Sequence, residues 1–186
     1  MSDRILNNTG RLMLYLVTNR SWSPNLFNAL LKMKKFFHLL KFIAVPLLVG
    51  YISMLLQHDS LENWYPSLLK SSLTPSGIVF SVVWTVLYVL MGVSAAIVWS
   101  KPVPGSWMLE LLYSLQLFLN LLWTFCFFFL RLPLPAFIVI VLLFLVVALF
   151  VAGCYRNHRV AAFLNFPYLL WLLFAVYLNG YVMICN

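Results

Sequence analysis

Five long apolar stretches limit what this chain can fold into. They lie at about 36–56, 77–99, 107–130, 135–155 and 160–184. A helix needs about 20 apolar residues to cross roughly 30 Å of hydrocarbon. A helix also satisfies its backbone polar groups internally, which lipid requires of any spanning segment. The stretches therefore predict an all-α integral membrane protein built as a bundle of five transmembrane helices.

The composition excludes a soluble protein. Apolar and aromatic residues make up 64% of the chain and charged residues 9%, whereas soluble domains carry roughly 25% charged residues. A net charge of +8 would suggest nucleic acid as the partner of a soluble protein. Here most of that charge precedes the first apolar stretch, and no nucleic-acid motif is present. We therefore expect these basic residues to lie against membrane lipid and not to bind nucleic acid.

The first 35 residues differ from the rest of the chain. They are basic and contain several turn-forming residues, and residues 26–37 resemble an amphipathic lead-in. We interpret residues 1–35 as a basic tail that is partly disordered or amphipathic, with a specific docking arm as the alternative. Residues 36–186 then form the membrane domain.

The distribution of Lys and Arg predicts the orientation. With five spans, ten of the twelve Lys and Arg residues fall on the side of the N-terminus, and Lys70 and Arg131 fall on the other side. Cytoplasmic loops carry the excess of positive charge. We therefore expect a multi-pass protein with a cytoplasmic N-terminus, in the inner membrane if the source is bacterial.

The interiors of the predicted helices lack ionisable side chains. No Asp, Glu, Lys, Arg or His lies near the middle of any stretch, and the three cysteines are far apart in sequence. This pattern argues against a proton relay, an ion pathway, a metal site or a conventional hydrolytic constellation. His38, His58 and His158 lie at edges or in loops, so haem would lack an evident axial ligand.

Uncharged polar and aromatic residues instead recur at helical spacing. Phe80, Trp84 and Tyr88 share one helix face, and Gln116, Asn120 and Thr124 share another beside Trp123. On the fifth stretch the shared face contains Tyr168, Trp171, Ala175, Leu178 and Asn179. Side chains three or four residues apart lie together on a helix, and polar stripes favour the bundle interior. Helix packing through interhelical hydrogen bonds is the alternative explanation of such stripes, and it is the favoured one for Gln116 and Thr124.

Three segments, in order, resemble the motifs of the TspO family. Residues 64–92 are similar to its WY-x-x-L … PP … F-x-x-V-W-T-x-LY-x-x-MG signature, residues 116–123 to QL-x-LN-x-x-W, and residues 166–179 to YPYL-x-W-x-x-FA-x-x-LN. The family comprises the tryptophan-rich sensory proteins of bacteria and the mitochondrial translocator protein, or peripheral benzodiazepine receptor. The resemblance covers about 37–186, nearly everything but the tail.

The resemblance implies a five-helix bundle, commonly dimeric, with a porphyrin-binding pocket that opens under the first loop. Trp84, Asn120, Trp123, Trp171 and Ala175 match its pocket positions. With their neighbours on the same faces, the candidate ligand-binding residues are Phe80, Trp84, Tyr88, Gln116, Asn120, Trp123, Tyr168, Trp171, Ala175 and Asn179. The family's sterol-recognition pattern is not matched, because Gly180 and Ile184 replace its aromatic and basic residues.

The favoured function is a membrane receptor or sensor for a porphyrin-type tetrapyrrole such as protoporphyrin IX or haem, with no cofactor required. A second hypothesis is light- and oxygen-dependent porphyrin breakdown, in which Trp84 and Trp171 donate electrons. A porphyrin or lipid transporter is a third hypothesis, and it is less favoured because broken helices and intramembrane charges are absent. We also expect a homodimer.

Overall fold

The computed structural model describes residues 24–101, 103 and 106–186. Most of the basic tail expected at 1–35 therefore lies outside the described residues. The chain divides into two units, Met1–His38 and Leu39–Asn186. The second unit contains the helical bundle and the candidate site, and it is described by itself below.

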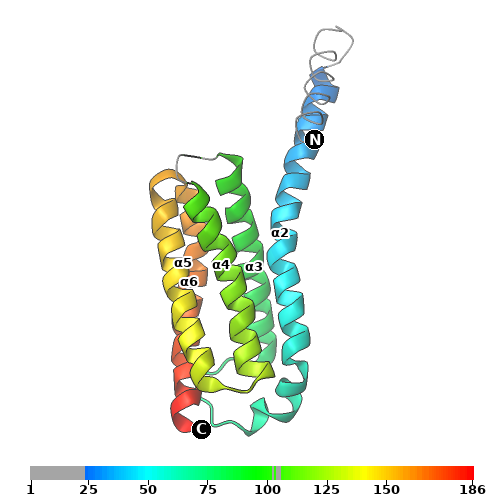
Figure 1. Cartoon of the computed structure of the whole chain (residues 1–186). Coiled ribbons are helices and arrows are strands. Elements are labelled where there is room, and N and C mark those ends of the chain that lie inside the picture. The colour runs from blue at the N-terminus through cyan, green and yellow to red at the C-terminus, as the bar shows by residue number, and fades with distance from the viewer. Residues whose placement is uncertain (1–23, 102, 104–105) are drawn as a thin grey trace, which may run out of the picture. The chain divides into compact units, whose positions relative to one another are not determined.

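The described residues form helices joined by short connections (Figure 1). In chain order the elements are α2 (Pro24–Asn63), the 3-10 turn η1 (Tyr65–Ser67), α3 (Gly77–Ser100), α4 (Ser106–Thr124), the π-helical turn η2 (Phe125–Phe129), α5 (Pro133–Asn157) and α6 (Arg159–Cys185). Five of the helical segments are long and apolar enough to cross a membrane. The structure thus confirms an all-α protein with five candidate membrane spans.

The helix ends follow from local sequence. Ser76 precedes α3 and its hydroxyl accepts a hydrogen bond from the Val79 backbone N–H, as N-caps do. Proline begins α5 at Pro133, where its missing N–H costs nothing. Arg131 adopts a positive φ of 57° and so lets the chain reverse between η2 and α5. The short Pro-containing turn makes α4 and α5 neighbours.

Helix α5 packs through a uniformly apolar face. Its completely buried side chains recur at alternating intervals of four and three residues, and they are Ala136, Ile140, Leu143, Val147, Phe150 and Cys154. This spacing keeps the side chains on one face of the helix. Helices α4 and α6 pack against α5, and α6 also packs against α3. These contacts make α3–α6 the compact part of the bundle.

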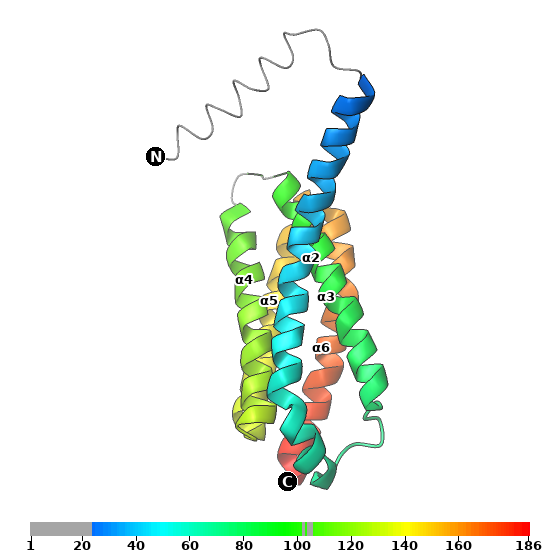
Figure 2. The ribbon, with the colours of Figure 1, turned by 90° about the vertical axis from the view of Figure 1, so that its right-hand side faces the viewer.

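Helix α2 after residue 38 uses the same spacing with different side chains. Its buried residues are Pro46, Ser53 and Ser60, seven residues apart. Gly50 and Gln57 are half-buried between them, as are the apolar Val49 and Leu56. This part of α2 lies beside α3 and α4 (Figure 2). Small and polar groups therefore face the bundle from α2.

Gly92 allows the closest approach between α2 and α3. A Cβ atom added at Gly92 would lie 2.5 Å from the Ile43 Cα atom, so any larger residue would push the two backbones apart. Gly92 and Ala96 form a pair of small residues four apart, a spacing that lets helices approach closely within a bundle or across a dimer. The structure shows the contact of Gly92 within one chain.

The first helix is longer than the predicted 36–56. It continues to Asn63, seven residues beyond the predicted apolar stretch. His58 and Glu62 lie 3.7 Å apart, and the Asn63 side chain donates to the Asp59 carboxylate at 2.8 Å. These pairs at i and i+4 stabilise a helix turn that is too polar for lipid. The loop therefore spans residues 64–76.

Candidate functional site

A cavity of about 240 Å³ lies between α2, α3 and α4. Helix α3 contributes Phe80, Trp84 and Tyr88, and α4 contributes Asn120 and Trp123. These residues come from the two stripes identified in the sequence. The remaining lining residues are Leu47, Gly50, Tyr51, Ser53, Met54, Gln57, Ser81, Thr85 and Thr124. We call this space the central cavity.

Aromatic rings form one wall of the central cavity. The Trp84 and Trp123 rings are stacked, with centroids 6.1 Å apart and an interplanar angle of 22°. The Trp84 ring also contacts Tyr88 at 5.6 Å and Phe80 at 6.0 Å. Offset-stacked and edge-to-face arrangements of this kind are favourable. The wall is therefore a flat surface of fixed indole rings that suits a planar apolar ligand.

A buried amide orders the floor of the cavity. The Tyr88 hydroxyl donates to the Asn120 Oδ1 atom at 2.9 Å, and the Asn120 Nδ2 atom donates to the Tyr168 hydroxyl at 2.9 Å. Asn120 and Tyr168 are almost completely buried. Both ends of this amide are thus engaged within the protein, and Asn120 joins α3, α4 and α6. In this arrangement Asn120 holds the Tyr88 hydroxyl in place.

A second amide fixes the ring beside Asn120. The Trp123 Nε1 atom donates to the Asn179 Oδ1 atom at 3.2 Å. Asn179 in turn donates to the Pro133 carbonyl at 3.5 Å. Trp123 is consequently held by α6 and by the start of α5.

Trp84 differs from Trp123 in having an unpartnered N–H group. The Trp84 Nε1 atom is buried and makes no hydrogen bond, although the side chain lines the central cavity and is only 7% exposed. An unpaired buried donor costs free energy. An acceptor on a bound molecule would recover that cost, so Trp84 offers both a stacking surface and a donor.

A smaller chamber of about 100 Å³ continues from the central cavity beneath the first loop. The two spaces share Gln57, Phe80, Ser81 and Trp123. The chamber's other lining residues are Leu61, Tyr65, Thr74, Pro75, Gly77, Phe127, Phe128, Ala175, Leu178, Asn179 and Val182. Together the two spaces run from the middle of the bundle to the loop.

Aromatic contacts join the loop to the end of α4. Trp64 packs against Phe127 with centroids 5.6 Å apart, and Tyr65 packs against Phe128 at 5.8 Å. Burial raises the pKa of the Tyr65 phenol, so the roof of the chamber stays uncharged at neutral pH. Tyr65 therefore covers the chamber, and Trp64 supports Phe127 beside it.

Side-chain hydrogen bonds tie the loop down. The Lys70 ammonium donates to the backbone carbonyls of Tyr65, Pro66 and Leu68 at 2.7–3.2 Å. The Ser71 and Tyr177 hydroxyls lie 3.0 Å apart. The Asn186 amide pairs with the Leu69 backbone, accepting from its N–H at 2.9 Å and donating to its carbonyl at 3.2 Å. These contacts fix the loop on α6.

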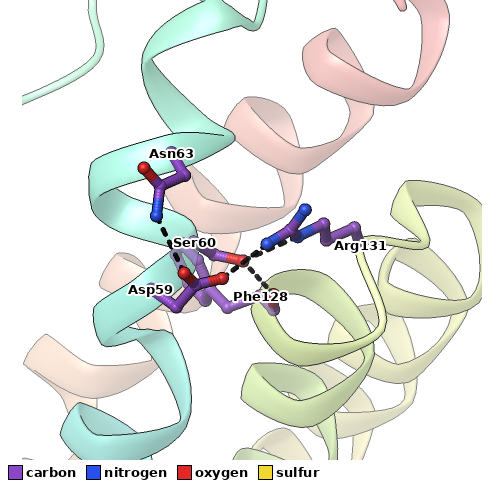
Figure 3. Close-up of polar contacts among 5 residues, drawn as sticks. All are labelled: Asp59, Ser60, Asn63, Phe128 and Arg131. Carbon is purple, nitrogen blue, oxygen red and sulfur yellow. Dashed lines mark hydrogen bonds and ion pairs between the residues drawn. The ribbon is translucent and has the colours of Figure 1, made fainter.

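The end of α2 is tied to the turn before α5 (Figure 3). The Arg131 guanidinium contacts the Asp59 carboxylate at 2.5 Å and donates to the Ser60 hydroxyl at 3.2 Å. The Ser60 hydroxyl donates to the Phe128 carbonyl. We call Asp59, Ser60, Phe128 and Arg131 the end cluster.

The structure brings together most of the sequence-predicted site residues. Phe80, Trp84, Tyr88, Asn120 and Trp123 line the central cavity. Ala175 and Asn179 line the chamber below the loop.

The other three candidates lie elsewhere. Tyr168 is buried behind Asn120. Gln116 is completely buried, with both amide atoms unpartnered, and it lines none of the three main pockets. Trp171 lines a separate groove on the outer face of α3 and α6, and it reaches the cavity wall through Phe80, 6.0 Å away.

Sequence reasoning missed the contribution of α2. Gly50, Ser53 and Gln57 line the central cavity, yet small and polar residues carry no apolar signal. A Cβ atom added at Gly50 would lie 2.6 Å from the Tyr88 ring, so this glycine lets the ring lie against the helix. The spacing of Pro46, Gly50, Ser53, Gln57 and Ser60 along one face was the available signal.

Among the described residues, no three His, Cys, Asp or Glu side chains are placed to bind a metal ion. The cavity lining contains no His or Cys. Its chemistry is that of aromatic faces, hydroxyls and amides, which favours an uncharged flat ligand over a coordinated metal.

Comparisons with known proteins agree with this architecture. The model of the TspO/MBR family matches residues 42–184. The chain is 33% identical to a tryptophan-rich protein TspO of Archaeoglobus fulgidus over 144 residues, covering 77% of this chain and 94% of the relative. It is 34% identical over 143 residues to a translocator protein of Sus scrofa, covering 74% and 83%. A tryptophan-rich sensory protein of Cereibacter sphaeroides is 34% identical over 125 residues, covering 67% and 78%.

Proposed function

The chain belongs to the TspO/MBR family, and on this premise we propose that it is a membrane receptor for a porphyrin-type tetrapyrrole. The site is the central cavity together with the chamber beneath the loop. The observation that carries the proposal is the stacked pair Trp84 and Trp123 on the wall of a cavity that lacks charged side chains. A planar apolar macrocycle would stack on these indoles.

The donor on Trp84 supports the same ligand class. Its unpartnered Nε1 atom would donate to an acceptor on the ligand, such as a ring nitrogen or a carboxylate. Because the cavity lining offers no imidazole or thiolate, a metal-free porphyrin such as protoporphyrin IX fits better than haem. Propionate groups of the ligand would extend toward the loop.

The size of the cavity adds a requirement. Volumes of about 240 and 100 Å³ are small beside the range of about 300–1,000 Å³ typical of ligand pockets. Binding a macrocycle therefore requires a wall to move outward. Helix α2 is the wall that can do so, since its inner face is small and polar.

Tryptophan fluorescence tests the proposal. Titration of the purified protein with protoporphyrin IX should quench its fluorescence in a saturable way. Trp84→Phe removes the free donor and reduces the stacking area, so it should weaken binding about tenfold. Val82→Ala, on the lipid side of α3, is the matched control and should bind as the wild type does. Quenching that never saturates would refute the proposal that the protein is a porphyrin receptor.

Light-dependent porphyrin breakdown is a second candidate function. It is favoured by the series of ring contacts from Trp171 through Phe80 to Trp84 and Trp123, each about 6 Å apart. Electrons would pass from an indole to a photoexcited porphyrin, with oxygen as the oxidant. Illuminated protein should convert the porphyrin to a defined product, more slowly in Trp84→Phe and Trp171→Phe. Equal loss of porphyrin absorbance in both variants would show bystander bleaching.

We further propose a homodimer with a cytoplasmic N-terminus. The dimer follows from the family resemblance, and the orientation follows from the bias of Lys and Arg. A detergent-corrected mass measurement tests the homodimer. Compartment-sensitive reporters on each terminus test the orientation.

A further inference from the structure

We propose that the ligand reaches the central cavity sideways, from the hydrocarbon of the bilayer, through an opening between α2 and α3. This proposal rests on the proposed function, since it concerns how the same cavity is filled. The opening is lined by Leu47, Tyr51 and Met54 on α2 and by Ser81 and Thr85 on α3. We call these five residues the window.

The window residues line the cavity and are also exposed. Tyr51 is 56% exposed and Met54 is 49% exposed, and Ser81 and Thr85 are exposed as well. Behind them lie the buried Trp84, Tyr88 and Asn120. The cavity thus has an exposed rim between two helices and a buried inner wall.

The window lies at membrane depth. Helix α3 begins at Gly77, so Ser81 and Thr85 lie about 6 and 12 Å along it at 1.5 Å per residue. Tyr51 is about 18 Å from the end of α2 at Asn63 by the same measure. Because the hydrocarbon layer is about 30 Å thick, the opening faces acyl chains and not water.

The polar groups on the rim are compatible with lipid. The Ser81 hydroxyl donates to the Gly77 carbonyl at 2.9 Å, and the Thr85 hydroxyl donates to the Ser81 carbonyl at 2.8 Å. Both hydroxyls are therefore satisfied by their own helix. The apolar ring of a ligand that slides past Ser81 and Thr85 leaves both hydroxyls with their partners.

Helix α2 is held on both sides of the window. On one side the Gly92 backbone touches α2 at Ile43, and on the other the end cluster fixes Asp59 and Ser60. Between these points the buried and half-buried side chains of α2 are small or polar except for Val49 and Leu56. Among the described residues, no hydrogen bond joins the α2 rim to Ser81 or Thr85. The middle of α2 can therefore bow outward while its attachments hold.

A second possible route for the ligand, beneath the first loop, is closed by polar contacts. The loop is fixed by Lys70, by the Ser71–Tyr177 contact and by the pairing of Asn186 with Leu69. The end cluster closes the side next to α4. Opening that route breaks several polar contacts, whereas opening the window breaks apolar contacts that lipid replaces.

Rapid-mixing fluorescence tests the window. Wild-type protein in proteoliposomes is mixed with vesicles preloaded with protoporphyrin IX, and association and dissociation rates are measured by tryptophan quenching. Thr85→Phe narrows the window and should slow both association and dissociation by at least about tenfold, as expected for a gate. Val86→Phe is the matched control, because the next residue lines the outer groove instead.

Two further variants make the result decisive. Tyr51→Ala widens the window at an exposed position and should speed both rates. Arg131→Gln loosens the end cluster and should change neither rate. Entry through the window is refuted if Arg131→Gln speeds both rates while Thr85→Phe and Tyr51→Ala leave both rates at the wild-type value. If the wild-type protein shows no saturable quenching, the proposed receptor function itself is refuted.

Discussion

Helices α5 and α2 present the same spacing of inward residues and produce opposite surroundings. The α5 face carries Ile140, Leu143 and Phe150, all completely buried. The α2 face carries Gly50, Ser53 and Gln57 and borders a cavity. Periodicity therefore decides which face of a helix turns inward, and side-chain volume decides whether that face fills the space or leaves it open.

In a membrane this difference has a direct mechanical meaning. Lipid tails are as apolar as leucine, so helix association depends on packing and on interhelical hydrogen bonds. Helix α5 has extensive packing with α4 and α6, whereas α2 after residue 38 relies on a close approach at Gly92 and on the end cluster. We infer that α3–α6 form the rigid framework and that α2 is the movable wall.

The largest expected effect lies in the α5 face. Phe150 is completely buried and its ring lies 6.1 Å from Tyr113. Phe150→Ala should lower the free energy of unfolding by about 3–5 kcal/mol, because it leaves a cavity in a packed interior. Leu149→Ala, at a 59% exposed neighbour, should change it by less than about 0.5 kcal/mol. Reversible unfolding in mixed micelles measures both, and equal losses would contradict a packed α5 face.

The next effect concerns the close approach of α2 and α3. Gly92→Val places methyl groups against the Ile43 backbone, so it should cost about 1–3 kcal/mol and move α2 away from α3. Gly77→Ala is the matched control, because nothing lies within 4 Å of an added Cβ atom there. A spin-label distance across the two helices, read with the unfolding free energy, checks both. An unchanged distance in Gly92→Val would show that α2 is not held at this point.

A third change fills the cavity from the α2 side. Ser53→Leu adds volume beside the central cavity, so stability should change by less than about 1.5 kcal/mol. Porphyrin affinity should fall at least about tenfold, because the added side chain occupies the ligand's space. Ser53→Ala should keep wild-type affinity. If Ser53→Leu unfolds the protein as strongly as Phe150→Ala, the inner face of α2 is packed and the contrast between the helices fails.

The smallest effect is expected at the end cluster. The Asp59 side chain is 70% exposed and that of Arg131 is 42% exposed, so solvent weakens their attraction. Asp59→Asn should cost about 0.2–1 kcal/mol, less at high salt. Unfolding at low and high ionic strength measures this. Glu62→Gln, one helical turn away, should have no effect above about 0.5 kcal/mol, and a loss above 2 kcal/mol at Asp59 would make the cluster a principal anchor.

The membrane fold was accessible from sequence because lipid imposes simple rules. Each span needs about 20 apolar residues, and the polar stripe of Gln116, Asn120 and Thr124 had to face inward. All three are buried. The limits of the first helix were missed because hydropathy reports the environment and not the backbone conformation. Residues 58–63 are polar, yet they continue the helix.

The candidate site was accessible in part. The faces of α3 and α4 were identified, because aromatic residues recur at helical spacing on α3 and polar residues do so on α4. Trp171 shares a face with Ala175, but spacing alone cannot tell which neighbouring helix a side chain meets, and Trp171 lies in the groove outside α3. The α2 side of the cavity depends on small residues whose effect is the space they leave.

The π-helical turn at Phe125–Phe129 has a consequence for sequence change. A π-helical turn holds one more residue than an α-helical turn would, and here it accompanies two consecutive inward rings, Phe127 and Phe128. Deleting a single residue from this segment would restore regular α-helical winding, which has no place for two consecutive inward rings. A one-residue deletion should therefore be tolerated by the helix itself but should remove one of the two ring contacts, Trp64 with Phe127 or Tyr65 with Phe128, that cover the chamber. The number of residues in Phe125–Phe129, as well as their identity, therefore determines whether both rings can face inward.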